Sequence, residues 1–395
     1  MNRREFMAVG AGGLAGLAFR QDDADFVVHE WGVATIVHGA SGIGAARSEG
    51  ATFAGGVEKP EELPKFVHTF RGMFDQTIEN WRNMPVRKPI VYFYAKKKMT
   101  VNVLVSIPRG RPHAWWPQAA EIAPRPVLPG RGRGFGDLGE LPKIEEMKPE
   151  NGLLRWPALV IDPLSVAKRP DADGWWPLGR KTASSPVVQG ENSDKFLFYD
   201  ALTFVDPGLD IEWTRDGKAK LSARADIPLA IAVRVKDGAC TFAQKKLAKG
   251  ESADLAPAAG TPDLVAPLVG AGLYKDEAVA LAEIWKEEFF QAPGARVLAI
   301  VSRAAYDALL PIEIAPKPDK LERVLIAHVE CLDPDVAARV GGWIAKLGAE
   351  SLDERDAAAA ELRKLGALAE MPIRAAAEKA TDADLKGRLL DLLKR

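Results

Sequence analysis

The stretch Phe26–Val37, with the sequence FVVHEWGVATIV, is rich in β-branched, aromatic and small apolar residues. A second stretch of this kind covers 90–107 and includes the alternating run MTVNVLV at 99–105. Such segments predict β-strands, because branched and aromatic side chains pack well on a pleated surface. We therefore expect these two stretches to set the fold as strands of a sheet.

Further short strand-like segments follow between 153 and 247. The segment at 228–235 ends in Lys236-Asp237-Gly238, a turn signal that predicts a hairpin to the next strand. After an Ala- and Pro-rich linker near 255–267, helical spacing runs over 273–290, and the pattern then changes to strand, helix, strand over 296–329.

From Asp333 onward the pattern is helical, with short helices expected at 352–365, 367–380 and 383–393. The predicted fold class is therefore α+β, with β-rich sandwich-like strands, a small strand-helix-strand block and a C-terminal helical cap. Along the chain we expect a signal peptide at 1–18, a β-rich region at 19–255, an α/β segment at 268–332 and the cap at 333–395. A Pro-, Gly- and Arg-rich loop excursion is expected within the β-rich region at 108–152.

The composition is that of a globular protein: of 395 residues, 47% are hydrophobic and 27% are charged. Lys and Arg number 53 and Asp and Glu number 54, a formal net charge of -1. This balance provides no long-range field to attract nucleic acid, so we expect no nucleic-acid partner. The pair Tyr92 and Lys96 imitates a short-chain dehydrogenase, but Tyr92 lies in a predicted strand, whereas that chemistry requires both residues on a helix.

The N-terminus has the layout of a twin-arginine signal peptide. Arg3 and Arg4 form its charged region, and the apolar, Gly- and Ala-rich run at 8–19 forms its hydrophobic region. This route carries folded proteins, and it predicts a periplasmic or extracellular location. No later stretch approaches the roughly 20 apolar residues of a membrane-spanning helix, so we expect no transmembrane segment in the mature chain.

Cys240 and Cys331 are the two cysteines of the chain. In an oxidising compartment they either form one disulfide or remain as two buried thiols, and the sequence leaves both outcomes open. Two cysteines are too few for a disulfide scaffold or for a four-cysteine zinc site.

Two histidines lie beside carboxylates and are the candidate metal ligands. His29 precedes Glu30, and His328 and Glu330 are two residues apart, which places them on one face of a predicted strand. If the two strands meet, the four side chains offer nitrogen and oxygen ligands to zinc or another divalent metal, with an open position for hydrolytic chemistry. No HExxH or comparable spaced signature accompanies them, so the expected cofactor is none, and a divalent metal is the alternative.

Two tryptophan pairs are the candidate ligand-binding residues. Trp115-Trp116 and Trp175-Trp176 each precede a proline in loop-like sequence. Flat indole faces with an N–H at the edge suit sugar rings, so these four residues predict contact with a glycan. The alternative is that the rings fill gaps beneath their loops, in which case an extended chain lets at most one ring of each pair be buried.

Several motifs together resemble a family of exported proteins of planctomycete-like and related bacteria. They include the opening His29-Glu30-Trp31-Gly32, the segment KPIVYFY at 88–94, WWPQ at 115–118 and DKFLFY at 194–199. The resemblance covers most of 29–330. No activity is assigned to that family, so the resemblance implies no catalytic residue. The tail at 352–393 looks like a single HEAT-like helical unit, which implies a contact surface.

We therefore expect an exported binding or structural protein that contacts a glycan or a protein partner. An enzyme is not favoured, because no Gly-x-Ser-x-Gly or other spaced catalytic motif occurs. The alternative is a metal-dependent hydrolase of the periplasm or cell surface, centred on His29, Glu30, His328 and Glu330.

Overall fold

A computed structural model describes residues 24–37, 63–69, 84–108, 110–123, 151–203 and 205–393. The predicted signal peptide at 1–18 lies outside these residues. The fold is mixed α+β, with 28% of the described residues in helices and 41% in strands, several sheets and C-terminal helices. The predicted fold class is therefore confirmed.

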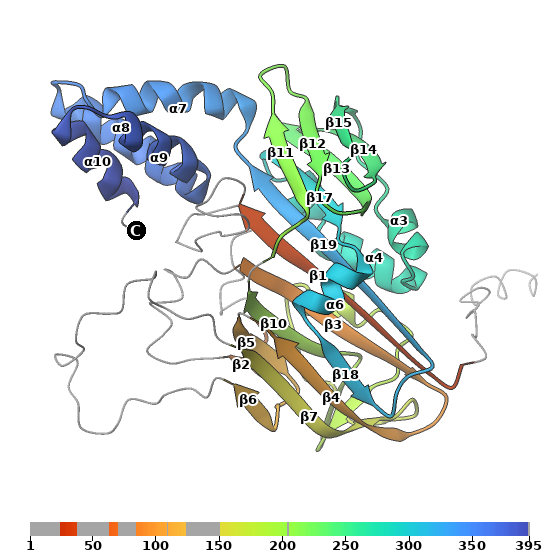
Figure 1. The fold of residues 1–395 in the computed structure, drawn as a ribbon. Coiled ribbons are helices and arrows are strands. Elements are labelled where there is room, and N and C mark those ends of the chain that lie inside the picture. The colour runs from red at the N-terminus through yellow and green to blue at the C-terminus, as the bar shows by residue number, and fades with distance from the viewer. Residues whose placement is uncertain are drawn as a thin grey trace, which may run out of the picture.

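The largest element is a sheet of ten strands that runs through the middle of the molecule (Figure 1). Its order is β16 (Ala258–Ala259), β14 (Ala239–Leu247), β13 (Ile227–Lys236), β17 (Gly294–Ile300), β19 (Lys320–Cys331), β1 (Phe26–Val37), β3 (Met84–Ala95), β10 (Leu197–Thr203), β5 (Arg111–Trp116) and β2 (His68–Thr69).

Strand β1 lies near the centre of this sheet. It pairs in parallel with β19 and antiparallel with β3, and all of its residues are buried. A strand covered on both faces needs no polar alternation, which explains its nearly continuous apolar sequence. The pairing of β1 with β19 also means that the predicted regions 19–255 and 268–332 contribute strands to one sheet.

Two smaller sheets complete the β-structure. One contains β18 (Ile312–Ala315), β4 (Met99–Ile107), β7 (Gly152–Ile161), β8 (Val187–Gln189) and β9 (Asn192–Asp194), with β6 (Glu121–Ala123) paired to β7. The other contains β11 (Leu209–Trp213), β12 (Ala219–Ala223) and β15 (Ser252–Leu255).

The expected loop excursion at 108–152 is wrong in part. Residues 111–116 form β5, which is buried throughout and pairs with β10, and residues 121–123 form β6. Residues 109 and 124–150 of the excursion lie outside the described part. Pro and Arg suggested a loop here, but the strand carries Pro112 at an irregular position of the ladder, where the register with β10 shifts.

Helices cover the sheet where the spacing predicted them. The segment expected to be helical at 273–290 forms α4 (Lys275–Ile284) and α5 (Lys286–Phe290), preceded by α3 (Val265–Gly270). The strand-helix-strand block is confirmed as β17, α6 (Arg303–Leu309) and β19, with β18 between the last two.

The C-terminal cap contains α7 (Pro334–Lys346), α8 (Leu352–Leu365), a short 3-10 helix (Gly366–Ala369), α9 (Glu370–Lys379) and α10 (Ala383–Leu393). The side chain of Asp333 caps α7 by accepting a hydrogen bond from the backbone N–H of Asp335, and Pro334 occupies the first turn. The cap packs around its own core of residues such as Val340, Leu362 and Leu389, separate from the core of the sheets.

The turn predicted at Lys236-Asp237-Gly238 is confirmed. Lys236 pairs with Ala239 across the β13–β14 hairpin, and Asp237 and Gly238 have φ of 51° and 76°. Two successive positive φ values are those of the turn that matches the twist of a hairpin, and an Asp-Gly pair adopts them readily.

The two cysteines are too far apart to bond. Strands β13 and β17 separate Cys240 on β14 from Cys331 on β19, which places them three strand spacings apart, roughly 14 Å. A disulfide requires Cα atoms within about 7 Å. Both cysteines are therefore free thiols in this fold.

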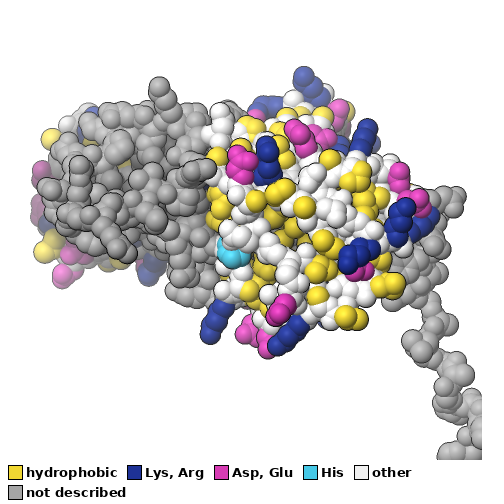
Figure 2. Space-filling model, turned by 90° about the horizontal axis from the view of Figure 1, so that it is seen from below, with side chains coloured by type: hydrophobic (Ala, Val, Ile, Leu, Met, Phe, Trp, Pro, Cys, Tyr) yellow, Lys and Arg dark blue, Asp and Glu magenta, His cyan; other side chains and the backbone are white. Residues whose placement is uncertain are grey.

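None of the helices in the described part of the chain is long and apolar enough to cross a membrane. On the face shown in Figure 2, basic and acidic side chains are interspersed among apolar ones. That mixture agrees with the near-zero net charge of the sequence.

Candidate functional site

The central strand β1 carries two neighbouring polar residues that project to opposite faces of the sheet, since side chains alternate along a strand. His29 and Glu30 are both fully buried. Each one belongs to a separate polar cluster.

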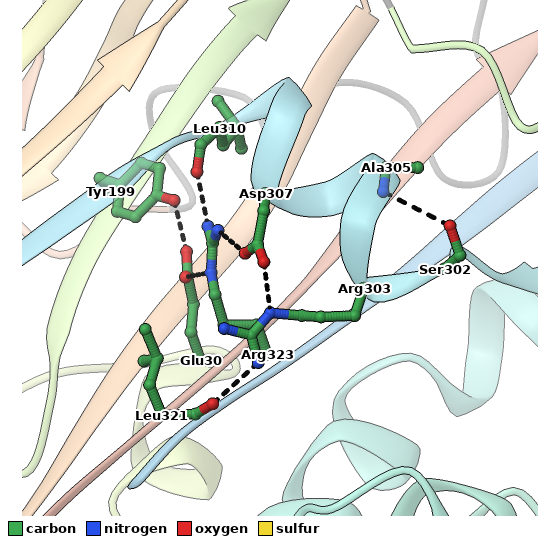
Figure 3. A network of polar contacts seen from close by, with 9 residues as sticks. All are labelled: Glu30, Tyr199, Ser302, Arg303, Ala305, Asp307, Leu310, Leu321 and Arg323. Carbon is green, nitrogen blue, oxygen red and sulfur yellow. Dashed lines mark hydrogen bonds and ion pairs between the residues drawn. The ribbon is translucent and has the colours of Figure 1, made fainter. Parts of the chain in front are cut away.

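Glu30 is the centre of the cluster in Figure 3. Its carboxylate accepts hydrogen bonds from the Tyr199 hydroxyl and, at 2.5 Å, from Arg323 Nε. Arg323 also donates to the Leu310 carbonyl and to Asp307 of α6, both at 2.7 Å. Burial opposes the charge on Arg323, but Glu30 raises the pKa of this guanidinium above its ordinary value. The cluster is closed, and its bonds fasten α6 to the sheet.

His29 belongs to a second buried cluster, on the opposite face, in which its Nε2 atom has no hydrogen-bond partner among the described residues. Its Nδ1 atom lies 2.8 Å from Glu277 of α4, which also accepts a hydrogen bond from the Tyr94 hydroxyl at 2.7 Å. The rings of Tyr94 and Tyr274 pack against the imidazole, with centroids 5.5 and 4.3 Å away. Burial and the nearby Glu277 raise the pKa of Tyr94 well above its ordinary value, so it is a hydrogen-bond donor at neutral pH.

The third cluster lies near the end of β19. Glu330 Oε1 is 2.8 Å from His328 Nε2 and accepts a hydrogen bond from Arg296 Nε at 2.9 Å. Arg296 is held by further bonds from Nη1 to the carbonyls of Phe289 and Ala292, and from Nη2 to the carbonyl of Pro293 at 3.3 Å. Burial alone raises the pKa of the Glu330 carboxyl, but Arg296 and His328 outweigh burial and hold the pKa below its ordinary value. Glu330 is therefore an ionised carboxylate inside the protein.

This third cluster opens into a pocket of about 430 Å³. The pocket lies where the ends of β13, β17 and β19 meet the cap, and we call it the junction pocket. It is lined by Val235, Lys236, Asp237, Pro293, Gly294, Arg296, Glu330, Cys331, Leu332, Asp333, Asp335, Val336, Arg339, Lys364, Leu365 and Leu368.

Gly294 keeps the floor of the junction pocket open. A Cβ atom at this position would lie 3.3 Å from Arg296 Nη2 and 4.0 Å from Glu330 Oε2, and the residue has φ of 132°, which disfavours other residue types. Glu330 Oε2 receives no hydrogen bond from the described residues. The floor therefore presents a carboxylate oxygen and a guanidinium nitrogen beside each other.

Ion pairs hold the rim of the junction pocket. Arg234 donates two hydrogen bonds to Asp333, at 2.8 and 3.0 Å, and Asp335 lies 2.9 Å from Arg234 and 2.7 Å from Lys236. The hydrogen bond from Lys236, followed by the charge of Arg234, holds the pKa of Asp335 below its ordinary value. These pairs connect the end of β13 to the start of α7, so they fix the cap relative to the sheet.

The four predicted metal ligands do not come together. On β1, His29 lies opposite Glu322 of β19, whereas His328 lies opposite Thr35. Positions 29 and 35 are six residues apart, roughly 20 Å along a strand. Within the described part of the chain, no group of three or more His, Cys, Asp or Glu side chains has the arrangement of a metal site. The predicted pairing of His328 with Glu330 on one strand face is present.

The expectation of one exposed ring in each tryptophan pair is wrong. Trp115 and Trp116 lie in β5, and Trp175 and Trp176 lie at the start of α2 (Trp176–Gly179); none is more than 7% exposed. The ring of Phe66 contacts both Trp116 and Trp176, so the two pairs join one buried aromatic cluster. In this structure the four residues are core, and none offers an open face to a ligand.

Sequence reasoning identified His328 and Glu330 but missed their partner Arg296 and the cap residues that face them. Arg296 opens the predicted strand at 296–301, where a solvated position is the ordinary assumption for an arginine. Its burial depends on carbonyls of α5 and of the loop before β17, and on Glu330 of the neighbouring strand, which no spacing within the sequence reveals.

No protein-family model, curated protein or solved structure matches this chain. The resemblance to exported bacterial proteins and the twin-arginine signal therefore stay predictions. The candidate site rests on its geometry alone.

Proposed function

We propose that this protein is an exported binding protein and that it holds a small polar ligand in the junction pocket. The observation that carries this proposal is the open side of the Arg296–Glu330 pair, a buried and ionised carboxylate with one oxygen left for an external donor. Ligand sites commonly form between separately packed parts of a protein, and the sheets and the cap have separate cores.

The size of the junction pocket favours a small molecule over a protein segment as the occupant. Its volume of about 430 Å³ is within the range of small-ligand sites. Apolar side chains supply much of its wall, while a few charged groups provide directional hydrogen bonds that orient a ligand. This is the usual distribution in sites that bind and orient a ligand.

The test is a thermal-unfolding screen of the full mature chain against amino acids, nucleosides, sugars, sugar phosphates and small carboxylic acids. A ligand at 100 times its Kd stabilises the folded state by about 2.7 kcal/mol, which is a readily measured shift. We expect at least one compound to raise the melting temperature of the wild type and to lose this effect in Val336→Phe, which fills the pocket from α7.

The matched control is Val279→Phe, which adds the same bulk at an exposed position of α4 outside the pocket. It should retain the response of the wild type. The proposal is wrong if no compound stabilises the wild type, or if the compounds that do so stabilise Val336→Phe equally.

We further propose that the protein acts outside the cytoplasmic membrane. The twin-arginine pattern of the first residues supports this location. Replacing Arg3 and Arg4 together by lysine keeps the charge but removes the paired guanidinium groups, and it should retain the protein in the cytoplasmic fraction. Replacing the nearby Arg20 by lysine is the control, and cell fractionation measures both. Equal export of the two variants would contradict the proposal.

A further inference from the structure

We infer that the ligand of the junction pocket is a neutral polyhydroxyl compound, with two adjacent hydroxyls placed against Glu330 Oε2 and Arg296 Nη2. This inference rests on the proposed function and names its ligand class. The inferred ligand agrees with the glycan predicted from the sequence. Its proposed binding site, however, is the junction pocket and not the tryptophan pairs.

The hydrogen-bonding groups on the floor form an acceptor and donor pair. Glu330 Oε2 only accepts, because the carboxylate is ionised. Arg296 Nη2 only donates; one of its two N–H groups bonds to the Pro293 carbonyl at 3.3 Å, and the other is the donor for a ligand. Both atoms lie close to the same side of Gly294. A hydroxyl both donates and accepts, so two neighbouring hydroxyls of one ligand satisfy the two atoms at once.

The charges of the pocket lining are balanced. Its four basic residues and four acidic residues are Lys236, Arg296, Arg339 and Lys364, and Asp237, Glu330, Asp333 and Asp335. Pairs within the protein already neutralise the charges at the floor and the rim. An anionic ligand would meet the charge of Glu330 at the floor, and a cationic ligand would meet Arg296. A neutral polar ligand avoids both penalties.

The apolar part of the wall comes from both the sheet and the cap. It consists of Val235, Pro293, Leu332, Val336, Leu365 and Leu368. A sugar ring has C–H faces that pack against aliphatic side chains and hydroxyls around its edge. The wall and the floor of the pocket together provide both kinds of contact.

Arg339 and Lys364 extend this chemistry toward the mouth of the pocket. The guanidinium of Arg339 lies over the ring of Trp343, 5.3 Å from its centroid, which orients it without consuming its hydrogen-bond donors. Lys364 pairs with Glu361 at an exposed site. Both side chains belong to the cap, so a ligand that reaches them contacts the sheet and the cap at the same time.

The experiment measures binding by isothermal titration with sugars that share a ring and differ in charge. The neutral probes are glucose, galactose, mannose and N-acetylglucosamine, and the charged probes are glucosamine and glucuronate. We expect at least one neutral sugar to bind. Glucosamine and glucuronate should bind about tenfold more weakly than that sugar, or worse.

Two glutamate variants make the test specific to the floor. Glu330→Gln removes the ionised acceptor and should weaken the neutral sugar about tenfold, while reducing the discrimination against glucuronate. Glu30→Gln is the matched control, because it also neutralises a buried glutamate paired to an arginine on the same sheet, but Glu30 does not line the pocket. It should bind sugar like the wild type.

Exposed variants keep the test valid if Glu330→Gln fails to fold. Lys364→Ala should weaken sugar binding several-fold, roughly as expected for one lost hydrogen bond. Lys386→Ala, at an exposed helical lysine of the cap outside the pocket, should leave sugar binding unchanged.

Tighter binding of glucosamine or glucuronate than of every neutral sugar overturns the inference, and so does the absence of binding by any sugar. If other compounds of the thermal screen still bind and Val336→Phe abolishes that binding, the ligand class is wrong but the proposed function stands. If no compound binds at all, both fail.

Discussion

Buried charged residues in this protein have two different roles, which depend on how completely their partners satisfy them. The Glu30–Arg323 pair is enclosed by Tyr199, Asp307 and a carbonyl, and it fixes the position of α6. The Glu330–Arg296 pair has the same chemistry, but one side of it faces a pocket. Accessibility, rather than residue type, distinguishes the structural pair from the candidate binding pair.

The low pKa of Glu330 predicts the pH dependence of stability. A carboxyl whose pKa is lowered by folding stabilises the native state above its unfolded pKa of about 4.3, and this contribution disappears as pH falls through the folded pKa. At neutral pH, Glu330→Gln should therefore lower the free energy of unfolding by about 3 kcal/mol, because it leaves Arg296 buried without its counter-charge. The gap to the wild type should narrow as the pH falls below about 4.3, the unfolded pKa, toward the lower folded pKa.

Urea unfolding at several pH values measures this gap. Glu313→Gln, at an exposed position of β18, is the control and should differ little from the wild type at any pH. A gap for Glu330→Gln that stays constant or widens on acidification would contradict the role assigned to the ionised carboxylate.

The two thiols should differ in reactivity. Cys331 is buried, and burial followed by the charge of Glu330 raises its pKa well above the ordinary value; Cys240 is partly exposed, and burial raises its pKa as well. Iodoacetamide should therefore label Cys240 first in the folded protein and Cys331 only after unfolding. Mass spectrometry under non-reducing conditions should find two thiols, and a recovered Cys240–Cys331 disulfide would contradict the sheet order.

At the scale of elements, local signals predicted the strands and helices well, and pairings between distant segments could not be predicted. The hairpin carries its own turn residues at Asp237-Gly238, and the cap helices α7 and α8 begin at the capping residues Asp333 and Ser351. Strand β5 has no such signal, because its apolar residues occur among prolines and arginines. It becomes a strand through its pairing with β10 and through the aromatic cluster that buries Trp116.

The candidate site shows the same contrast between local features, which the sequence predicts, and pairings between distant segments, which it does not. The i, i+2 spacing of His328 and Glu330 is a local feature, and it correctly placed both on one face of a strand. The parallel register of β1 and β19 is not local, so the sequence could not reveal that His29 and His328 lie far apart along the sheet. The cap residues of the junction pocket come from a third region, whose docking depends on the ion pairs of Arg234.

Two glycines should respond to alanine with opposite signs. Gly238 has φ of 76° in the β13–β14 turn, and a Cβ atom there meets no neighbour, so Gly238→Ala should destabilise by about 1 kcal/mol through backbone strain alone. Gly341 lies in the middle of α7, also without neighbours, and Gly341→Ala should stabilise by about 0.5–1 kcal/mol. Denaturant unfolding of both variants measures the difference, and shifts of the same sign would contradict this assignment.

At the scale of the whole molecule, the sheets and the cap are two separately packed units joined by a short, charge-paired junction. The ten-stranded sheet and its neighbours share one core, and the cap helices share another. The junction pocket lies between them (the cap and the upper end of β19 are seen in Figure 1). A ligand in this position contacts both units.

Because the two cores are separate, a cavity-forming substitution in one core should increase hydrogen exchange in that unit only. Leu362→Ala removes a fully buried side chain of the cap and should cost about 2–5 kcal/mol. Hydrogen exchange should then accelerate in α8, α9 and α10, while the amides of β1, β17 and β19 keep their protection. Leu325→Ala, the matched change at a buried position of β19, should instead accelerate exchange in the sheet. Equal acceleration of both units by Leu362→Ala would mean that the cap does not unfold on its own.

The parallel register of β1 and β19 also orders the events of protein synthesis. Glu30 and Arg323 are in contact although 293 residues separate them in the chain. A nascent polypeptide leaves the ribosome from its N-terminus, so one edge of β1 lacks its partner until β19 has emerged. Such high contact order slows folding, and an exposed strand edge invites aggregation meanwhile. On the proposed export route, which carries folded proteins, translocation can therefore begin only after translation has nearly finished, and a chaperone that shields β1 would be needed until then.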